Sequence, residues 1–163
     1  MTRVLTAIGK GVLAGVAGTA LMTAYQEAVS RARGRSAAAE QLREPRTWAE
    51  APAPARLAKR VSEGVFDKRV VKRQAPLITS VVHWSYGASL GGAYGLAAAR
   101  LHKNAALQGV AFGTAVWGLA YASLAPLGIY EAPWRYPAKA LGIDLSYHLV
   151  YGLGVAGVFD ALD

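Results

Sequence analysis

Ionisable side chains interrupt stretches of the sequence that are otherwise strongly apolar. Asp144 and His148 are four residues apart, so a helix would place both on one face, with Gly152 continuing the stripe. His83 lies in a second uncharged stretch, and Glu27 closes the first. Ionisable groups inside a membrane segment indicate a functional site by default. We therefore expect a buried polar layer made of Glu27, His83, Tyr86, Asp144, His148 and Tyr151.

Such a layer is compatible with three kinds of chemistry. Two facing imidazoles could bind haem iron axially, could hold a metal ion together with Glu27 and Asp144, or could relay protons near neutral pH. The structural alternative, which we favour, is that each histidine hydrogen-bonds a carboxylate or a backbone carbonyl and fixes the helix packing. We also expect helices this rich in glycine to pack too closely to leave an obvious cavity. The sequence has no phosphate-binding loop, HExxH helix or nucleophile elbow, so we expect no enzyme, no cofactor and no metal.

The composition indicates a membrane protein. Hydrophobic residues make up 53% of the 163 residues and charged residues only 17%, against about 25% charged in soluble domains. A membrane-spanning helix needs roughly 20 apolar residues. Cysteine is absent, which excludes disulfides and thiolate chemistry. We predict a single all-α integral membrane domain over residues 1–163, with four transmembrane helices at about 4–28, 76–100, 105–127 and 141–161.

The positive charge is concentrated in one connection between predicted spans. Of the 18 Lys and Arg residues, 12 lie in the segment 31–73, which the positive-inside rule places in the cytoplasm, with both chain ends outside. Because the net charge of +8 belongs to this loop, we expect no nucleic-acid partner. An amphipathic helix is predicted at about 55–66, where Leu57, Val61 and Val65 are four apart. It would lie on the anionic inner leaflet, or the segment would be a solvated loop that only sets topology. The expected lipid-facing basic residues are Arg56, Lys59 and Arg60.

Glycines four residues apart predict close helix packing in a four-helix bundle, through the GxxxG type of spacing. The sequence also suggests two copies of a helical hairpin, because His-x-x-Tyr-Gly occurs at His83 and again at His148. The two histidines would then lie at equal depth, and the copies would be related by an axis along the membrane normal. The expected packing glycines are Gly11, Gly15, Gly87, Gly91, Gly95, Gly109, Gly113 and Gly152.

Several short motifs occur together between residues 75 and 160. They are His83-Trp84-Ser85-Tyr86-Gly87, Gly92-Ala93-Tyr94-Gly95, Pro126-Leu127-Gly128, Pro133-Trp134, and the stretch from Asp144 to Gly152. With these motifs the chain resembles the YagU-like family of small bacterial inner-membrane proteins, including its four-span actinobacterial relatives. The long basic loop departs from the general pattern of that family. The resemblance implies a multi-pass protein of the bacterial inner (plasma) membrane and implies no particular reaction.

Three functions remain open from the sequence. The first is a non-enzymatic accessory or packing protein, which would associate through its glycine-rich helix faces as a homo-oligomer or as a subunit of a membrane complex. The second is a small proton- or ion-linked transport protein that uses the buried Glu/His/Asp layer. The third is a redox subunit with a b-type haem between two histidines. A cavity that reaches both histidines would favour the second function over the first.

Overall fold

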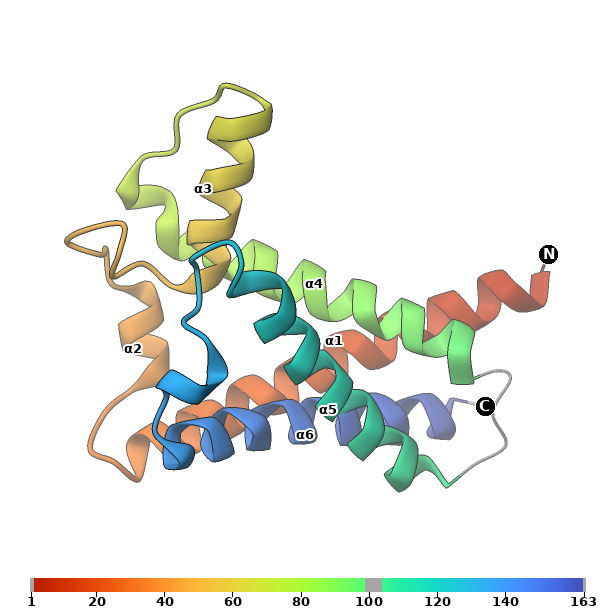
Figure 1. Ribbon diagram of the computed structural model, residues 1–163. Coiled ribbons are helices and arrows are strands. Elements are labelled where there is room, and N and C mark those ends of the chain that lie inside the picture. Colours follow the sequence, from red (N-terminus) through yellow and green to blue (C-terminus); the bar gives the residue numbers. More distant parts are fainter. Residues whose placement is uncertain (1, 99–103, 163) are drawn as a thin grey trace.

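A computed structural model describes residues 2–98 and 104–162. Its four long helices are α1 (Thr2–Arg31), α4 (Ala75–Ala98), α5 (Ala105–Leu124) and α6 (Ala138–Ala161), as Figure 1 shows. No strand occurs within these described ranges, so the predicted all-α class is confirmed. The connections carry shorter helices, namely α2 (Ala37–Leu42), α3 (Ala53–Val65) and the 3₁₀ turns Lys72–Gln74 and Pro133–Arg135.

Three of the long helices, α1, α5 and α6, are long and apolar enough to cross a membrane. They agree with the predicted spans at 4–28, 105–127 and 141–161 to within one helical turn. The fourth prediction, 76–100, corresponds to α4, although its last two positions lie outside the described residues. This helix has 24 residues and no formal charge, but its polar and aromatic side chains lower its mean hydropathy. The structure therefore indicates a membrane protein with three candidate spans.

Local sequence accounts for where several helices begin. The side chain of Asn104 accepts hydrogen bonds from the backbone N–H groups of Ala106 and Leu107 and so caps α5. Pro137 immediately precedes α6. The first backbone N–H groups of a helix have no partner within it, so the N–H that proline lacks removes no helical hydrogen bond. Gly34 follows α1 with a positive φ of 69°, a conformation that glycine adopts without strain. The chain reverses its direction in this turn, so the start of α2 lies beside the end of α1.

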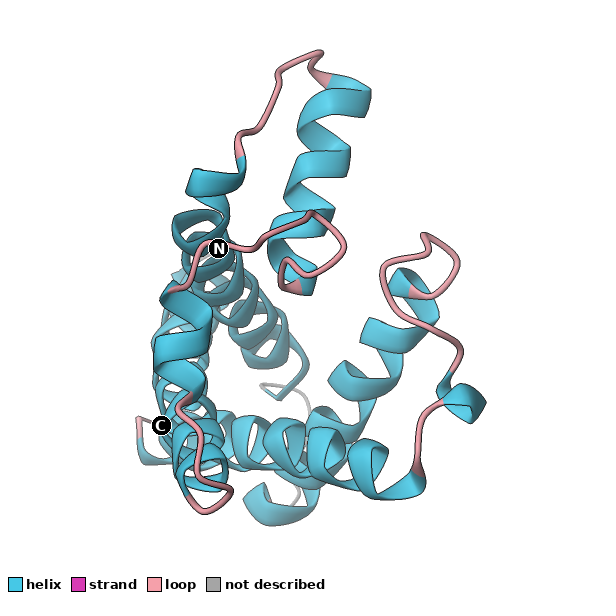
Figure 2. Cartoon of the chain, turned by 90° about the vertical axis from the view of Figure 1, so that its left-hand side faces the viewer, coloured by secondary structure: helices cyan, strands magenta, loops and turns pink. Residues whose placement is uncertain are grey.

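The four long helices form an open curve with α1 in an inner position. One side of α1 packs along α4 and the other packs along α6, while α5 packs on α6. Figure 2 shows the resulting shape: α4 and α5 stand at opposite ends of the curve and diverge from each other. Because α4 and α5 do not pack along their lengths, the side of the molecule between them stays open.

The predicted packing glycines lie inside the two hairpins. A methyl group added at Gly91 would clash with the carbonyl oxygen of Gly11, and one at Gly152 would clash with that of Gly109. The backbones of α1 and α4, and of α5 and α6, therefore touch directly, as small residues in membrane helices allow. All eight of these glycines meet the other helix of their own hairpin, so the glycine-rich faces are occupied within the chain.

The two hairpins pack through the same pattern of glycines, but not in the register that the sequence match predicts. The carbonyl group of Gly87 lies opposite Gly15, and the carbonyl group of His148 lies opposite Gly113. Thus His148 occupies the place of Gly87 and not that of His83, one helical turn away. In the same register, His83 lies four residues before Gly87 and is therefore equivalent to Asp144, which lies four residues before His148. The prediction of two equivalent histidines at equal depth is wrong, because backbone contact between small residues sets the register.

The connection between α1 and α4 folds into an arm, which we define as residues 32–74. Its main helix, α3, agrees with the prediction at 55–66 and crosses the direction of the long helices (Figure 1). A small buried cluster fixes the base of the arm, because Ala51 and Ala55 pack against Ala75 at the start of α4. The arm therefore covers one end of the open curve.

Candidate functional site

A cavity of about 620 Å³ occupies the open side between α4 and α5. Its walls come from all four long helices, and residues of the arm line its mouth. The expectation that the glycine-rich helices leave no cavity is wrong, because the tight contacts are confined to α1–α4, α5–α6 and α1–α6. Among the lining residues are five of the six predicted for the polar layer: His83, Tyr86, Asp144, His148 and Tyr151.

Aromatic rings close the space between α4 and α5 at the end remote from the arm. The Tyr94 ring centroid is 4.9 Å from that of Phe112 and 5.6 Å from that of Phe159. The Tyr94 hydroxyl also donates a hydrogen bond of 3.1 Å to Gln108 Oε1, which joins α4 to α5. The Phe112 ring continues this layer toward Tyr151, with 5.8 Å between their centroids. These contacts bridge α4 and α5 at the end remote from the arm, while residues of the arm line the other end of the cavity.

Asp144 is the best-connected ionisable group of the cavity. Its Oδ2 accepts hydrogen bonds from Trp117 Nε1 at 3.0 Å and from the Tyr121 hydroxyl at 3.1 Å. Both donors come from α5, where a spacing of four residues places them on one face. Hydrogen bonds to a carboxylate stabilise its charged form. Trp117 and Tyr121 were not predicted as site residues, although their spacing of four and their polar groups in an apolar helix were the available signal.

His148 is fixed by its own helix. Its Nδ1 lies 2.8 Å from the backbone oxygen of Asp144 and 3.9 Å from Oδ1 of the same residue. Since a carbonyl oxygen can only accept, Nδ1 carries the proton of the neutral ring and Nε2 keeps its lone pair. This arrangement agrees with the expected structural role of a histidine that bonds a carbonyl. It also leaves one basic nitrogen for a ligand.

His83 does not fulfil the same expectation. In the described part of the chain, its Nε2 is a buried atom without a hydrogen-bond partner, and so is Oγ1 of Thr79. The two residues are one turn apart on α4, and both line the cavity. Leaving a buried polar atom unpaired costs about 1–3 kcal/mol. These two atoms are therefore available to a polar group bound in the cavity.

Tyrosines contribute much of the remaining wall. The Tyr151 hydroxyl donates to the backbone oxygen of Gly87 at 2.7 Å and so links α6 to α4. Tyr86 is 46% exposed, so its ring stays accessible from the cavity. Tyr130 enters from the connection after α5, and burial is the main reason why its pKa rises to about 12. Its phenol is therefore neutral at physiological pH.

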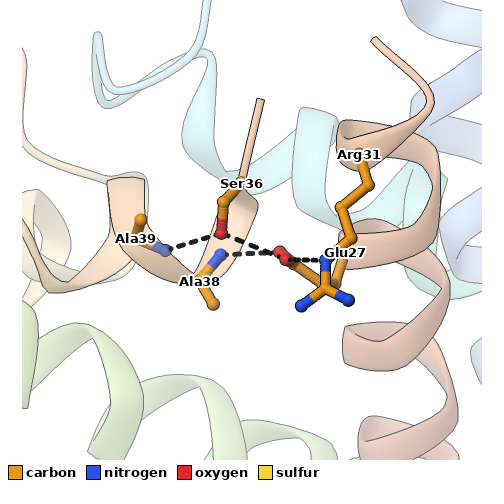
Figure 3. A network of polar contacts seen from close by, with 5 residues as sticks. All are labelled: Glu27, Arg31, Ser36, Ala38 and Ala39. Atoms are coloured by element: carbon orange, nitrogen blue, oxygen red, sulfur yellow. Dashed lines mark hydrogen bonds and ion pairs between the residues drawn. The ribbon is translucent and has the colours of Figure 1, made fainter. Parts of the chain in front are cut away.

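Glu27 does not belong to the cavity, and its assignment to the polar layer is wrong. Figure 3 shows its carboxylate at the corner between α1 and α2. Oε1 accepts from Arg31 Nε at 2.7 Å and from Ser36 Oγ at 3.0 Å, while Oε2 accepts from the backbone N–H of Ala38 at 2.9 Å. The turn through Gly34 brings the start of α2 back to this carboxylate. A metal site that combines Glu27 with Asp144 and the histidines is therefore not formed.

The basic residues predicted to face lipid have other surroundings. Arg56 donates to the backbone oxygens of Ile129 at 2.8 Å and Gly128 at 3.0 Å. Lys59 pairs with Glu63, and this hydrogen bond is the main reason why the pKa of Glu63 lies below its usual range. Arg60 is exposed. Arg56 therefore ties the arm to the connection after α5, and Lys59 forms an ion pair within α3. That the three cations face lipid stays a prediction.

No family model, no curated protein and no solved structure matches the chain. The site is therefore interpreted from its own geometry: a cavity with the Asp144 carboxylate, two imidazoles and several phenols in its inner wall, and Arg35 and Glu40 at its mouth.

Proposed function

We propose that the protein is a small multi-pass membrane carrier that binds a solute in this cavity and couples its movement to protonation of the polar layer. The observation that carries the proposal is that one cavity is lined by His83, Asp144 and His148 together. Imidazoles change charge between about pH 5 and 8, so solute binding next to them depends on their protonation. A site with its mouth at the arm and with ring contacts between α4 and α5 beyond its far end is also the form expected of a carrier that faces one side of the membrane.

The same proposal includes a topology. Helix α4 is the fourth span, because its 24 uncharged residues lie alongside α1. The Lys and Arg excess of the arm places the arm in the cytoplasm. The mouth of the cavity then opens to the cytoplasm, and the two hairpins cross the membrane in the same sense. The resemblance to YagU-like proteins favours the bacterial inner membrane as the location.

In this topology the tip of the arm contacts the inner leaflet. Val65 is 72% exposed and Phe66 is 64% exposed, and Val61 lies on the same side of α3 as Val65. Lys68 and Arg69 follow after Asp67, and all three are exposed. Apolar side chains beside cations suit an anionic lipid surface. The stripe formed by Arg56, Lys59 and Arg60 lies on a different face of α3 and points away from such a surface.

A partner or a second copy would need surfaces other than the occupied glycine faces. Gly118, Gly142 and Gly157 have open space around them and lie on α5 and α6. An accessory role of the protein would therefore depend on these outer faces.

Electrical recordings on reconstituted vesicles test the carrier. Purified protein in liposomes would be exposed to concentration jumps of cationic, anionic and neutral amphipathic solutes at pH 5.5 and 7.5. We expect at least one class to give a pH-dependent transport current. His148→Ala and Asp144→Asn should reduce that current about tenfold or more. Asp160→Asn changes the same side-chain type on the same helix at an exposed site outside the cavity, so it should retain the current.

Absence of a current for every solute class, with folded protein in the vesicles, would reject the carrier. The same purified sample serves to check the haem alternative. A visible absorption band that is lost in both His83→Ala and His148→Ala would instead support a haem held between the two histidines.

A further inference from the structure

We infer that the solute bound in this cavity is a hydrophobic organic cation, such as a protonated amine. The inference rests on the proposed function and names the chemical class of its solute.

The charge of the inner wall favours a cation. When the histidines are neutral, Asp144 supplies the one formal charge that the described residues place in the inner part of the cavity, and it is negative. The other charged lining residues, Arg35 and Glu40, are exposed at the mouth and have opposite signs. The side chain of Asp144 is 32% exposed, so Oδ1 remains accessible while Oδ2 holds Trp117 and Tyr121.

Hydrogen-bonding groups in the wall favour a donor on the solute. His148 offers the lone pair of Nε2, because its Nδ1 proton is directed to a backbone oxygen. His83 Nε2 and Thr79 Oγ1 are buried and unpaired, and both can accept. The N–H groups of a protonated amine would satisfy these acceptors and remove the cost of leaving them unpaired.

Aromatic and apolar groups complete the match. Tyr86, Tyr130, Tyr147 and Tyr151 line the cavity, and the electron-rich face of a tyrosine ring attracts cations. Such contacts contribute most when the cation is desolvated, as in a cavity of this kind. Leu90, Met22 and Val116 add apolar wall, which suits the hydrocarbon part of the solute. An anion of the same shape would meet Asp144 and the ring faces unfavourably.

Protons compete with such a solute. The ionisable groups facing the two imidazoles are Asp144, Tyr86, Tyr147 and Tyr151, together with Tyr130. At physiological pH the phenols are neutral, so protonation of His83 and His148 adds positive charge next to Asp144. Cation binding should therefore weaken as acid protonates the two imidazoles. In a carrier, this competition would exchange one monovalent cation for the two protons that the imidazoles take up, so that each cycle moves net charge and gives a current.

A matched pair of probes tests the inference. Tetraphenylphosphonium and tetraphenylborate have the same shape and opposite charges. Equilibrium dialysis of the full chain in neutral detergent, with protein-free micelles as the blank, measures both. We expect tetraphenylphosphonium to bind at least tenfold more tightly than tetraphenylborate at pH 8, and several-fold more weakly at pH 5.5.

Variants locate the site. Asp144→Asn should weaken tetraphenylphosphonium binding about tenfold, while its amide oxygen can still accept from Trp117 and Tyr121. Asp160→Asn should bind like the wild type. Tyr86→Leu provides a second variant that removes a ring and no charge, and it should weaken the cation more than the anion.

The inference fails if tetraphenylborate binds as well as tetraphenylphosphonium, or if neither Asp144→Asn nor Tyr86→Leu changes the binding of the cation. Transport currents with neutral or anionic solutes alone would then support the proposed carrier function and reject only the inference that its solute is a cation. If the chain shows neither transport currents nor binding of any probe, both the carrier function and the inference of a cationic solute are rejected.

Discussion

Asp144 shows what residue types and spacing predict and what they leave out. The stack of Asp144 and His148 on one helical face follows from their separation of four residues, and the structure contains it. The partners on α5, Trp117 and Tyr121, depend on which helices become neighbours, and local periodicity does not contain that information. Glu27 was misassigned for the same reason. Its i, i+4 pairing with Arg31 was visible in the sequence, but the return of α2 was not.

Adding one methyl group should destabilise the protein at a glycine of α6 that contacts another helix, but not at a glycine of α6 with open space around it. Gly152→Ala would force a side chain against the Gly109 carbonyl, whereas Gly157 has nothing within 4 Å. Overpacking typically costs about 1–3 kcal/mol. Thermal unfolding in detergent should therefore show clear destabilisation for Gly152→Ala and little change for Gly157→Ala. Equal stability of the two variants would mean that α5 and α6 do not meet through their backbones.

Among the elements, the long helices were predictable and their pairing was only partly so. Long apolar stretches with few or no charges predict α1, α4, α5 and α6, and small residues four apart predict close packing of α1 with α4 and of α5 with α6. The separation of α4 from α5 was not predictable, because both helices carry small residues on several faces. The register of the hairpins was also missed, since it depends on which carbonyl each glycine meets.

The arm gives a prediction at the scale of an element. Arg56 holds α3 to the connection after α5 through two backbone oxygens, so Arg56→Ala should free the arm from that connection. Hydrogen–deuterium exchange should then increase several-fold in α3 while α6 is unchanged. Arg60→Ala removes an exposed cation from the same helix and should leave exchange as in the wild type. Unchanged protection of α3 in Arg56→Ala would show that its buried alanines alone hold the arm.

For the whole molecule, charge distribution determines the expected orientation in the membrane. A reporter that is active only in the cytoplasm should work when inserted at Gly34, in the exposed turn before α2. The same reporter fused after residue 163 should be inactive, because the four proposed spans would return the chain to the outer side. Activity in the reverse pattern would place the mouth of the cavity on the outer face and would reverse the direction of the proposed exchange.

The inner position of α1 has a consequence for biosynthesis. This helix is synthesised well before its packing partners, α4 and α6. At about 5–20 residues per second, several seconds pass before α4 is complete, and α6 follows later still. During that interval the small-residue face of α1 with Gly11, Gly15 and Gly18 has only lipid or the insertion machinery to contact. Assembly of the four helices is therefore complete only after α6 has been synthesised, and a nascent chain stalled before α6 would leave one side of α1 without its packing partner.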